Sequence, residues 1–304
     1  MLSKKNIEYP KNLLNRAKMP SPVRAAIVSA GNSLAIESAY EATNKSFIEP
    51  IFIGEKDKIY NETDKIGWDI SSYEIIDEKI DQKSAQIAAK IASEDRAQIL
   101  IKGHIHTDIL MRAMLKKDLN LIGSRRLSHL WHMTINTDDK PLFITDGALN
   151  VLPRLEVKMN ILKNAVDFAI KTGVEIPKVA LLSGTEDPIE SLPSSMDAKE
   201  LMERAKKENI PAIVYGPLAF DNAVSKNAAN IKEIHNDVAG NADILLVPNL
   251  ETGNSLVKMM IYFMGACAAG IVVGGKVPIV VTSRADNKVS RLASIAAAII
   301  ATIK

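Results

Sequence analysis

The chain has 304 residues, of which 47% are hydrophobic and 24% charged, a composition typical of a folded protein with enough apolar material for one large or two smaller domains. Its 38 basic and 36 acidic residues leave a net charge of only +2, which argues against proteins that bind nucleic acids or anionic membrane surfaces through an excess of positive charge. The single cysteine, Cys267, excludes an intrachain disulfide, and because no signal-like or membrane-spanning apolar segment is evident we expect a soluble cytoplasmic protein.

Along the chain, short runs rich in β-branched residues alternate with helical segments. In the first half, strands are predicted at residues 25–29, 50–53, 73–76, 98–101, 126–135 and 141–145, and helices at residues 35–42, 84–92 and 156–172. In the second half, helices separate strands predicted at residues 178–183, 211–214, 243–247, 270–273 and 277–282. We interpret residues 192–195 (LPSS) as a surface loop and the apolar residues 292–303 as a helix packed on both sides.

These strands are almost continuously apolar, which is typical of parallel sheets covered by helices on both faces. The pattern therefore predicts an α/β fold with largely parallel sheets. A domain boundary is expected near residues 146–153, where a strand ends and a helix-rich stretch begins. The pattern alone does not tell which domain the C-terminal helix completes.

Polar residues follow several predicted strands, and ligands of such sheets bind beyond the carboxyl ends of the strands. Residues 281–286 (VTSRAD) end one strand. Arg284 offers a planar fork of donors for phosphate or carboxylate, Ser283 adds a hydroxyl, and Asp286 can accept a proton. An Arg–Asp pair that closes the strand end is the structural alternative.

A second cluster, residues 248–255 (PNLETGNS), combines a glycine-containing turn with the start of a helix, whose free N–H groups suit an anion. Asn254 and Lys258 lie four residues apart and share a helical face. A plain N-cap by Thr252 or Asn254 is the alternative.

A third cluster, residues 215–223 (YGPLAFDNA), is interpreted as a tight Gly-Pro turn followed by a helix that Asp221 or Asn222 caps.

In residues 102–112 (KGHIHTDILMR), His104 and His106 suggest a metal at first glance. However, no third ligand stands at a fitting spacing, and contacts to phosphate or ribose are equally compatible with the segment. Arg112 follows Asp108 by four residues, so a helical ion pair is the alternative to ligand binding.

Residues 123–129 (GSRRLSH) contain paired arginines, which either bind a phosphate-rich ligand or are solvated surface charges. Cys267 stands in an apolar segment without a histidine at a recognisable spacing and is interpreted as a buried small hydrophobe. The chain contains no Walker A, Gly-x-Gly-x-x-Gly, Gly-x-Ser-x-Gly or His-Glu-x-x-His pattern, which removes several enzyme classes.

Several segments together resemble the phosphate acetyltransferase and phosphate butyryltransferase family. These are residues 216–223 (GPLAFDNA), 242–254 (ADILLVPNLETGN), 269–286 (AGIVVGGKVPIVVTSRAD) and 291–294 (RLAS). The segments most similar to the butyryltransferase-like branch are residues 102–110 (KGHIHTDIL), 126–129 (RLSH) and 140–146 (KPLFITD). The similarity runs from about residue 24 to the C-terminus, and its specificity comes from the order and spacing of the segments.

The resemblance implies two α/β/α domains with a cleft between them, in a fold similar to that of the isocitrate and isopropylmalate dehydrogenases, and usually a homodimer. On this basis the first domain comprises residues 1–148, completed by the C-terminal helix at residues 287–304. The second comprises residues 149–286.

The resemblance also implies the reaction acyl-CoA + phosphate ⇌ acyl phosphate + CoA, without a metal, a cofactor or a covalent intermediate. Coenzyme A, acyl-CoA, phosphate and acyl phosphate are then the ligands, and neither nucleic acid nor membrane is a partner. Ser283 and Arg284 fall on the family's Ser-Arg positions, and Asp286 is the expected base that takes the thiol proton. Candidates for binding CoA and phosphate are Lys102, Thr107, Arg112, Arg126, Asn222, Asn254 and Lys258.

Two positions depart from the family pattern. In acetyl-specific members the base lies several residues beyond the Ser-Arg pair, near Ser290, where this chain has no acid, so Asp286 is the nearest substitute. Tyr215 stands where the butyryltransferase-like branch often has aspartate. These departures keep a second reading open, a non-catalytic acyl-CoA sensor of the same fold. Branch similarity alone favours a short acyl chain.

Overall fold

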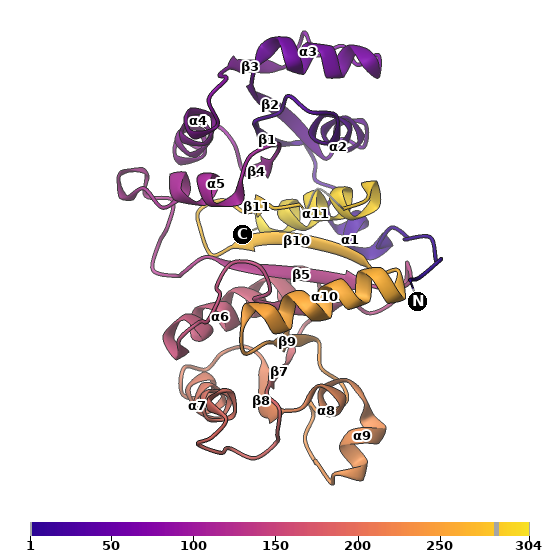
Figure 1. The fold of residues 1–304 in the computed structure, drawn as a ribbon, viewed down its shortest axis with the longest axis vertical. Helices are drawn as coiled ribbons and strands as arrows, with labels where there is room; N and C mark the ends of the chain where they lie inside the picture. Colours follow the sequence, from indigo (N-terminus) through magenta and orange to yellow (C-terminus); the bar gives the residue numbers. More distant parts are fainter. Residues whose placement is uncertain (1, 283–285, 304) are drawn as a thin grey trace. The chain divides into compact units, whose positions relative to one another are not determined.

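A computed structural model describes residues 2–282 and 286–303 of the chain (Figure 1). Contacts between residues divide the chain into two compact units. The N-terminal unit comprises Tyr9–Arg125 and Ala269–Lys304, and the central unit comprises Met1–Glu8 and Arg126–Ala268. The boundary expected near residues 146–153 falls inside the central unit. The strand just before these residues, Leu142–Thr145, pairs both with an earlier strand, Ser128–Thr134, and with a later one, Ile244–Leu246.

The sheet of the N-terminal unit has the strand order β3-β2-β1-β4-β11-β10. Its strands are β1 (Val23–Val28), β2 (Ile48–Gly54), β3 (Glu74–Asp77), β4 (Ile99–Lys102), β10 (Cys267–Val273) and β11 (Ile279–Val280). All neighbours pair in parallel except β10 and β11, which pair antiparallel. The β-branched runs therefore form the predicted parallel sheet, and residues 25–28 of its central strand β1 are completely buried.

Helices cover both faces of this sheet (Figure 1). On one face lie α1 (Lys11–Arg16), α2 (Ser33–Asn44), α3 (Lys56–Lys65) and α11 (Lys288–Ala301), and on the other lie α4 (Asp81–Ser93) and α5 (Thr107–Met114). A short 3-10 turn follows at Lys117–Leu119. The apolar C-terminal helix, predicted to pack on both sides, does so: residues 290–300 of α11 are all buried.

The sheet of the central unit has the order β5-β6-β9-β7-β8. Its strands are β5 (Ser128–Thr134), β6 (Leu142–Thr145), β7 (Lys178–Leu182), β8 (Ile213–Leu218) and β9 (Ile244–Leu246). The pair β5–β6 is antiparallel and the other pairs are parallel. Both units thus combine a mostly parallel sheet with one antiparallel pair at one end.

In the central unit, α6 (Leu155–Lys171) and α7 (Pro193–Lys207) cover one face of the sheet (Figure 1). On the opposite face lie α8 (Phe220–Val224) and α10 (Leu250–Met264), with α9 (Lys226–Ile231) following α8. The core under α10 includes Trp131, Ile144, Leu245 and Val257. None of the helices that the structure describes is long and apolar enough to cross a bilayer.

Two local predictions in the central unit are wrong. Residues 192–195 are not a surface loop, because Pro193 opens α7 and Ser195 is completely buried, with its hydroxyl bonded to Leu192 O at 2.8 Å. Gly216 and Pro217 do not form a tight turn but lie within β8. Glycine is required there because a Cβ would lie 2.6 Å from the Cβ of Leu181, and proline is tolerated because β8 is an edge strand.

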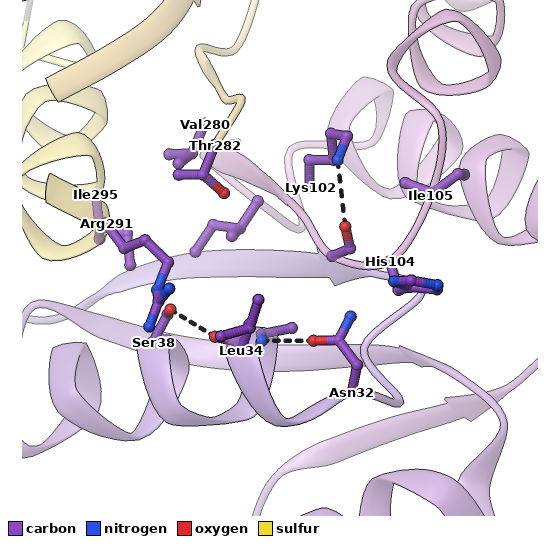
Figure 2. Close-up of a pocket in the computed structure, with 13 residues that line it drawn as sticks. Asn32, Leu34, Ser38, Lys102, His104, Ile105, Val280, Thr282, Arg291 and Ile295 are labelled. Atoms are coloured by element: carbon purple, nitrogen blue, oxygen red, sulfur yellow. Dashed lines mark hydrogen bonds between the residues drawn. The ribbon is translucent and has the colours of Figure 1, made fainter. Parts of the chain in front are cut away.

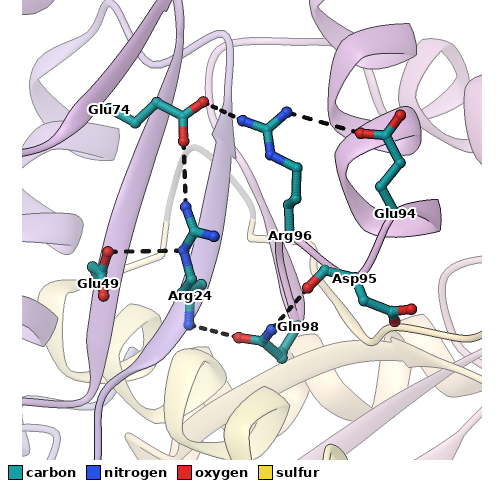
Figure 3. A network of polar contacts seen from close by, with 7 residues as sticks. All are labelled: Arg24, Glu49, Glu74, Glu94, Asp95, Arg96 and Gln98. Atoms are coloured by element: carbon teal, nitrogen blue, oxygen red, sulfur yellow. Dashed lines mark hydrogen bonds and ion pairs between the residues drawn. The ribbon is translucent and has the colours of Figure 1, made fainter.

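An ion-pair network joins the amino ends of the strands in the N-terminal unit (Figure 3). Arg24 of β1 lies 3.3 Å from Glu74 of β3 and 3.8 Å from Glu49 of β2. Arg96 also pairs with Glu74, and the backbone N–H of Arg24 donates to Gln98 at 2.9 Å. The charges at this edge of the sheet are therefore matched to one another.

Candidate functional site

The opposite edge of the N-terminal sheet, at the carboxyl ends of β1, β4 and β11, is shaped by a close crossing of two backbone segments. Gly103, directly after β4, donates its N–H to Val28 O at 2.9 Å, and His104 donates to Ser29 O at 3.0 Å. A Cβ on Gly103 would lie 2.5 Å from both carbonyl oxygens, so only glycine fits. This crossing directs the segment after β4 toward the end of β1.

A pocket lies at this edge, with an empty volume of about 560 Å³ that is open to solvent (Figure 2). Its polar lining residues come from four segments that are far apart in the sequence. They are Asn32 and Ser38 of the segment that contains α2, Lys102 at the end of β4 and His104 just after it, Thr282 after β11, and Arg291 of α11. The pocket therefore lies where ligands of parallel sheets usually bind, beyond the carboxyl ends of the strands.

The charged groups in this pocket are cationic. Lys102 is half-buried, and its Nζ donates to Gly103 O at 3.4 Å. Arg291 is 6% exposed, and its Nη1 donates to the carbonyl of Asp286 at 2.6 Å. At the same edge α2 begins, with Asn32 Oδ1 accepting the N–H of Ala35 at 2.8 Å. Two cations beside a helix N-terminus suit an anion such as a phosphoryl group.

The three predicted catalytic residues follow Thr282 in the sequence. Ser283 and Arg284 lie outside the described residues. Asp286 is described and half-buried, and its carbonyl is held by Arg291. Asn287 then caps α11, with its Oδ1 accepting the N–H of Ser290 at 2.9 Å. Ser290, where acetyl-specific relatives were expected to place their base, is buried within the first turn of α11.

The structure does not bring Thr107 and Arg112 to this pocket. Thr107 is the first residue of α5, and the Arg112 side chain is 80% exposed and lies 3.1 Å from Asp108. The helical ion pair left open by the sequence is therefore present. Arg112 lines a separate surface groove with Gln82 and Lys116. Across the described part of the chain, no group of three or more His, Cys, Asp or Glu residues is placed to hold a metal ion.

The remaining predicted residues lie in the central unit. Asn222 is completely buried in α8, which begins at Phe220, so neither Asp221 nor Asn222 is its N-cap. The Nδ2 of Asn222 donates to Glu186, which also lies 3.1 Å from Lys232 Nζ. Partial burial raises the pKa of Glu186, but the hydrogen bonds from Lys232 and Asn222 outweigh it and lower the pKa below its ordinary value.

Glu186 was not identified from the sequence, where it stands among polar residues that are typical of a solvated loop. Its only signal was its position four residues after β7, at a strand end. Its contacts make it the acceptor that orients the Asn222 amide. The Oδ1 of Asn222 has no hydrogen-bond partner within the described ranges.

Asn254 and Lys258 lie in α10, which begins earlier than predicted. Its N-cap is Asn249, whose Oδ1 accepts the N–H of Thr252 at 2.9 Å, so Thr252 and Asn254 are not caps. Asn254 Nδ2 donates to Gly147 O at 3.3 Å. Because a Cβ on Gly147 would lie 2.9 Å from the Gly253 carbonyl carbon, the loop after β6 and the first turn of α10 touch through glycines.

Asp146, in the loop after β6, holds this edge together. Its carboxylate is buried and accepts the N–H groups of His129, Ala148 and Leu149 at 2.9, 3.0 and 2.9 Å, and the Asn150 amide at 2.7 Å. Because this carboxylate accepts hydrogen bonds from four donors of the protein, we interpret its role as stabilising the fold. Arg126 is exposed nearby, with its Nε 3.4 Å from Asn150 Oδ1.

His129 and His132, two histidines of β5, are buried and neutral at pH 7. Burial lowers the pKa of His129 to about 4, against the opposing effect of the Asp146 charge. Burial likewise lowers the pKa of His132 to about 4. His132 packs edge-on against Phe143, with ring centroids 5.3 Å apart. Both histidines are therefore part of the core.

Comparisons with known proteins agree on one family. A sequence profile described as "Phosphate acetyl/butaryl transferase" matches residues 73–301. A phosphate acetyltransferase of Rhizobium meliloti is 38% identical over 287 residues, covering 94% of this chain and 91% of the relative. A phosphate butyryltransferase of Clostridium beijerinckii is 35% identical over 287 residues, covering 94% of this chain and 95% of the relative.

Among solved structures, a branched-chain phosphotransacylase from Enterococcus faecalis V583 superposes with a TM-score of 0.80. It is 30% identical in sequence, and the match covers 92% of this chain and 99% of that one. The similarity extends over both units.

Proposed function

Because this chain belongs to the phosphate acetyl/butaryl transferase family, we propose how its residues carry out acyl transfer between coenzyme A and phosphate. The protein is an acyltransferase that catalyses acyl-CoA + phosphate ⇌ acyl phosphate + CoA. The observation that carries the residue assignment is the cationic pocket at the carboxyl edge of the N-terminal sheet, into which Thr282 of the VTSRAD segment leads.

In the direction of acyl-CoA synthesis, Asp286 takes the proton of the CoA thiol, and the thiolate sulfur attacks the carbonyl carbon of the acyl phosphate. The bond between that carbon and the phosphoryl oxygen then breaks, and phosphate leaves with the bonding electrons. Arg284 and Ser283 hold the phosphoryl group and stabilise the developing oxyanion, with Lys102 supplying a further cation. Binding of CoA and phosphate is assigned to Lys102, Thr107, Arg112, Arg126, Asn222, Asn254 and Lys258.

We propose a short acyl chain as the substrate. The two relatives, an acetyltransferase at 38% identity and a butyryltransferase at 35%, do not separate the two chain lengths. One methylene in an apolar pocket changes the free energy of binding by only about 1–3 kcal/mol, so neighbouring chain lengths will overlap as substrates.

The test is phosphate-dependent release of the CoA thiol from acetyl-, propionyl-, butyryl- and a long-chain acyl-CoA. We expect release from the short-chain substrates that stops when phosphate is omitted. If none of them releases thiol with phosphate present, the catalytic assignment is wrong. Binding of CoA without turnover would then identify the protein as the acyl-CoA sensor. Highest activity on the long-chain substrate would contradict the proposed chain length.

We propose that the protein acts as a homodimer. Three large side chains of α10 support this, because Met259, Tyr262 and Phe263 are 44%, 45% and 55% exposed and follow one another along the helix surface. Exposed apolar groups of this size gathered on one surface are typical of protein contacts. Phe263→Glu is expected to lower the mass measured by light scattering to that of one chain, whereas Glu251→Gln, on the same helix, is expected to leave it unchanged.

We propose further that the reaction takes place in the cytoplasm and needs no metal or other cofactor. The lone Cys267 is buried, as suits a reducing compartment. Activity that is unchanged after dialysis against a strong chelator is the expected result. Loss of activity that a divalent cation restores would contradict it.

A further inference from the structure

Arg291, which the sequence analysis did not select, is a buried cation in the wall of the pocket. It lies in the first turn of α11 and is 6% exposed (Figure 2). A guanidinium is seldom buried unless carboxylates or carbonyl groups satisfy its charge and its donors. Its contacts therefore show what holds it in this position.

The shortest contact of Arg291 is not with an acid. Its Nη1 donates to the main-chain carbonyl of Asp286 at 2.6 Å. The nearest acidic contact is Glu37 of α2, whose Oε2 lies 4.0 Å from Nη2, at the outer limit of an ion pair. The Nε of Arg291 is buried and has no hydrogen-bond partner in residues 2–282 and 286–303. The guanidinium is thus directed at the backbone of the segment that precedes its own helix.

This bond fixes one end of the segment that carries the proposed chemistry. Thr282 lies in the pocket wall and follows β11, which pairs with β4. Asp286 stands four residues later, and its carbonyl is bound to Arg291. The position of the Asp286 main chain relative to the pocket therefore depends on a side chain that also lines the pocket.

We propose that Arg291 is a positioning residue for acyl transfer, because its bond to the Asp286 carbonyl sets the place of the Asp286 carboxylate. This inference rests on the proposed function, in which Asp286 is the general base. A displacement of about 1 Å at a reacting group can lower a rate by about 100-fold, so the loss of this one bond is expected to lower kcat.

The experiment compares Arg291→Gln and Arg291→Lys with two matched controls. Lys288→Gln removes a cation one turn away, which lies 3.5 Å from Glu37 and is 68% exposed. Glu37→Gln removes the carboxylate near Arg291 and leaves the bond to Asp286. We expect kcat to fall by about 100-fold in Arg291→Gln and by about 10-fold in Arg291→Lys, with KM for CoA changed less than about threefold. Both controls are expected to stay within about twofold of the parent protein.

A double-mutant cycle with Asp286→Asn tests whether Arg291 acts through Asp286. We expect Arg291→Gln to lower kcat by less than about twofold when Asp286 is already asparagine, because the two residues belong to one unit. Equal loss in both backgrounds would overturn the proposal, as would a loss in Glu37→Gln as large as in Arg291→Gln.

Thermal unfolding separates positioning from support of the fold. Retained folding with reduced kcat supports the proposal. If neither Arg291 variant folds, Arg291 is a structural residue and the proposal is rejected. An inactive parent protein would reject the proposed function and this inference with it, whereas an active parent with unaffected variants would reject the inference alone.

Discussion

The two edges of the sheet in the N-terminal unit carry charge in opposite ways. At the amino ends of the strands, Arg24 and Arg96 share Glu74, and each charge has a partner of opposite sign (Figure 3). At the carboxyl ends, Lys102 and Arg291 line a pocket (Figure 2). Lys102 donates to the carbonyl of Gly103, and Arg291 donates to the carbonyl of Asp286. In both bonds the acceptor is a main-chain carbonyl and not a carboxylate.

Charged residues thus have two roles in this sheet: they pair with one another at the amino edge and line a pocket at the carboxyl edge. Paired surface charges contribute little free energy of folding, because water already solvates them well. The cations that line the pocket are placed to attract an anionic ligand. The comparison therefore predicts that substitutions at the carboxyl edge change catalysis and that those at the amino edge change almost nothing.

The largest effect is expected at Asp286. Asp286→Asn keeps the size of the side chain but removes the group that takes the thiol proton, so kcat is expected to fall by about 1,000-fold. Initial rates of thiol release at saturating acyl-CoA and phosphate measure this, and Asp81→Asn, at the start of α4, is the control. A fall of less than about tenfold would mean that another residue is the base.

Acid unfolding tests whether buried groups or the surface network limit stability. The folded-state pKa of His129 and His132 is about 4, below the ordinary 6.5, so the unfolded chain binds more protons between these values. The free energy of unfolding is therefore expected to fall as pH drops from about 6.5 toward about 4, by on the order of 3 kcal/mol for each histidine.

Urea unfolding at a series of pH values measures that slope. Replacing either buried histidine with glutamine should reduce it, whereas replacing the exposed His235 should not. If stability stays constant across this range, the histidines are not buried in their neutral form in solution.

A smaller effect is expected at Lys102. Lys102→Met removes the charge and keeps the aliphatic stem, so KM for phosphate is expected to rise by about tenfold, with kcat changed less. Lys65→Met, on the exposed last turn of α3, is the matched control. An unchanged KM for phosphate would show that the phosphoryl group does not bind at this end of the pocket.

The smallest effect is expected at the amino edge. Glu74→Gln breaks the ion pairs with Arg24 and Arg96 but leaves exposed groups that water can solvate. The free energy of unfolding is therefore expected to change by about 0–1 kcal/mol and kcat not at all. Urea unfolding and the thiol assay measure both quantities. A large loss of activity from this substitution would contradict the separation of the two edges.

The sequence predicted most strands because their β-branched runs are buried, as in β1, β4 and β9. It failed where the decisive contact comes from a distant segment. Gly216 and Pro217 have the local signal of a turn, but the close approach of Leu181 makes them part of β8. Pro193 likewise suggests a loop, although proline is equally suited to the first position of a helix.

From the sequence, the candidate site could be predicted only for residues that lie at the ends of predicted strands. Lys102 was selected because it follows the strand predicted at residues 98–101. In the structure it is the last residue of β4 and lines the pocket. Arg112 belongs to the same segment after that strand and was selected with Lys102. Only the structure shows that Arg112 is exposed and paired with Asp108, outside the pocket. Arg291 and Glu186 were missed because their roles arise from packing against segments that sequence spacing does not identify.

The division of the N-terminal unit between the two ends of the sequence has a consequence for biosynthesis. β11, most of β10 and the largely buried α11 come from Ala269–Lys304, whereas the other strands of this sheet and its other helices come from Tyr9–Arg125. During translation, at about 5–20 residues per second, the central unit is complete before the N-terminal unit has its last strand and helix. The faces of β4 and α2 that β11 and α11 later cover are therefore exposed for about 10–40 seconds, during which the emerging chain can aggregate or bind chaperones.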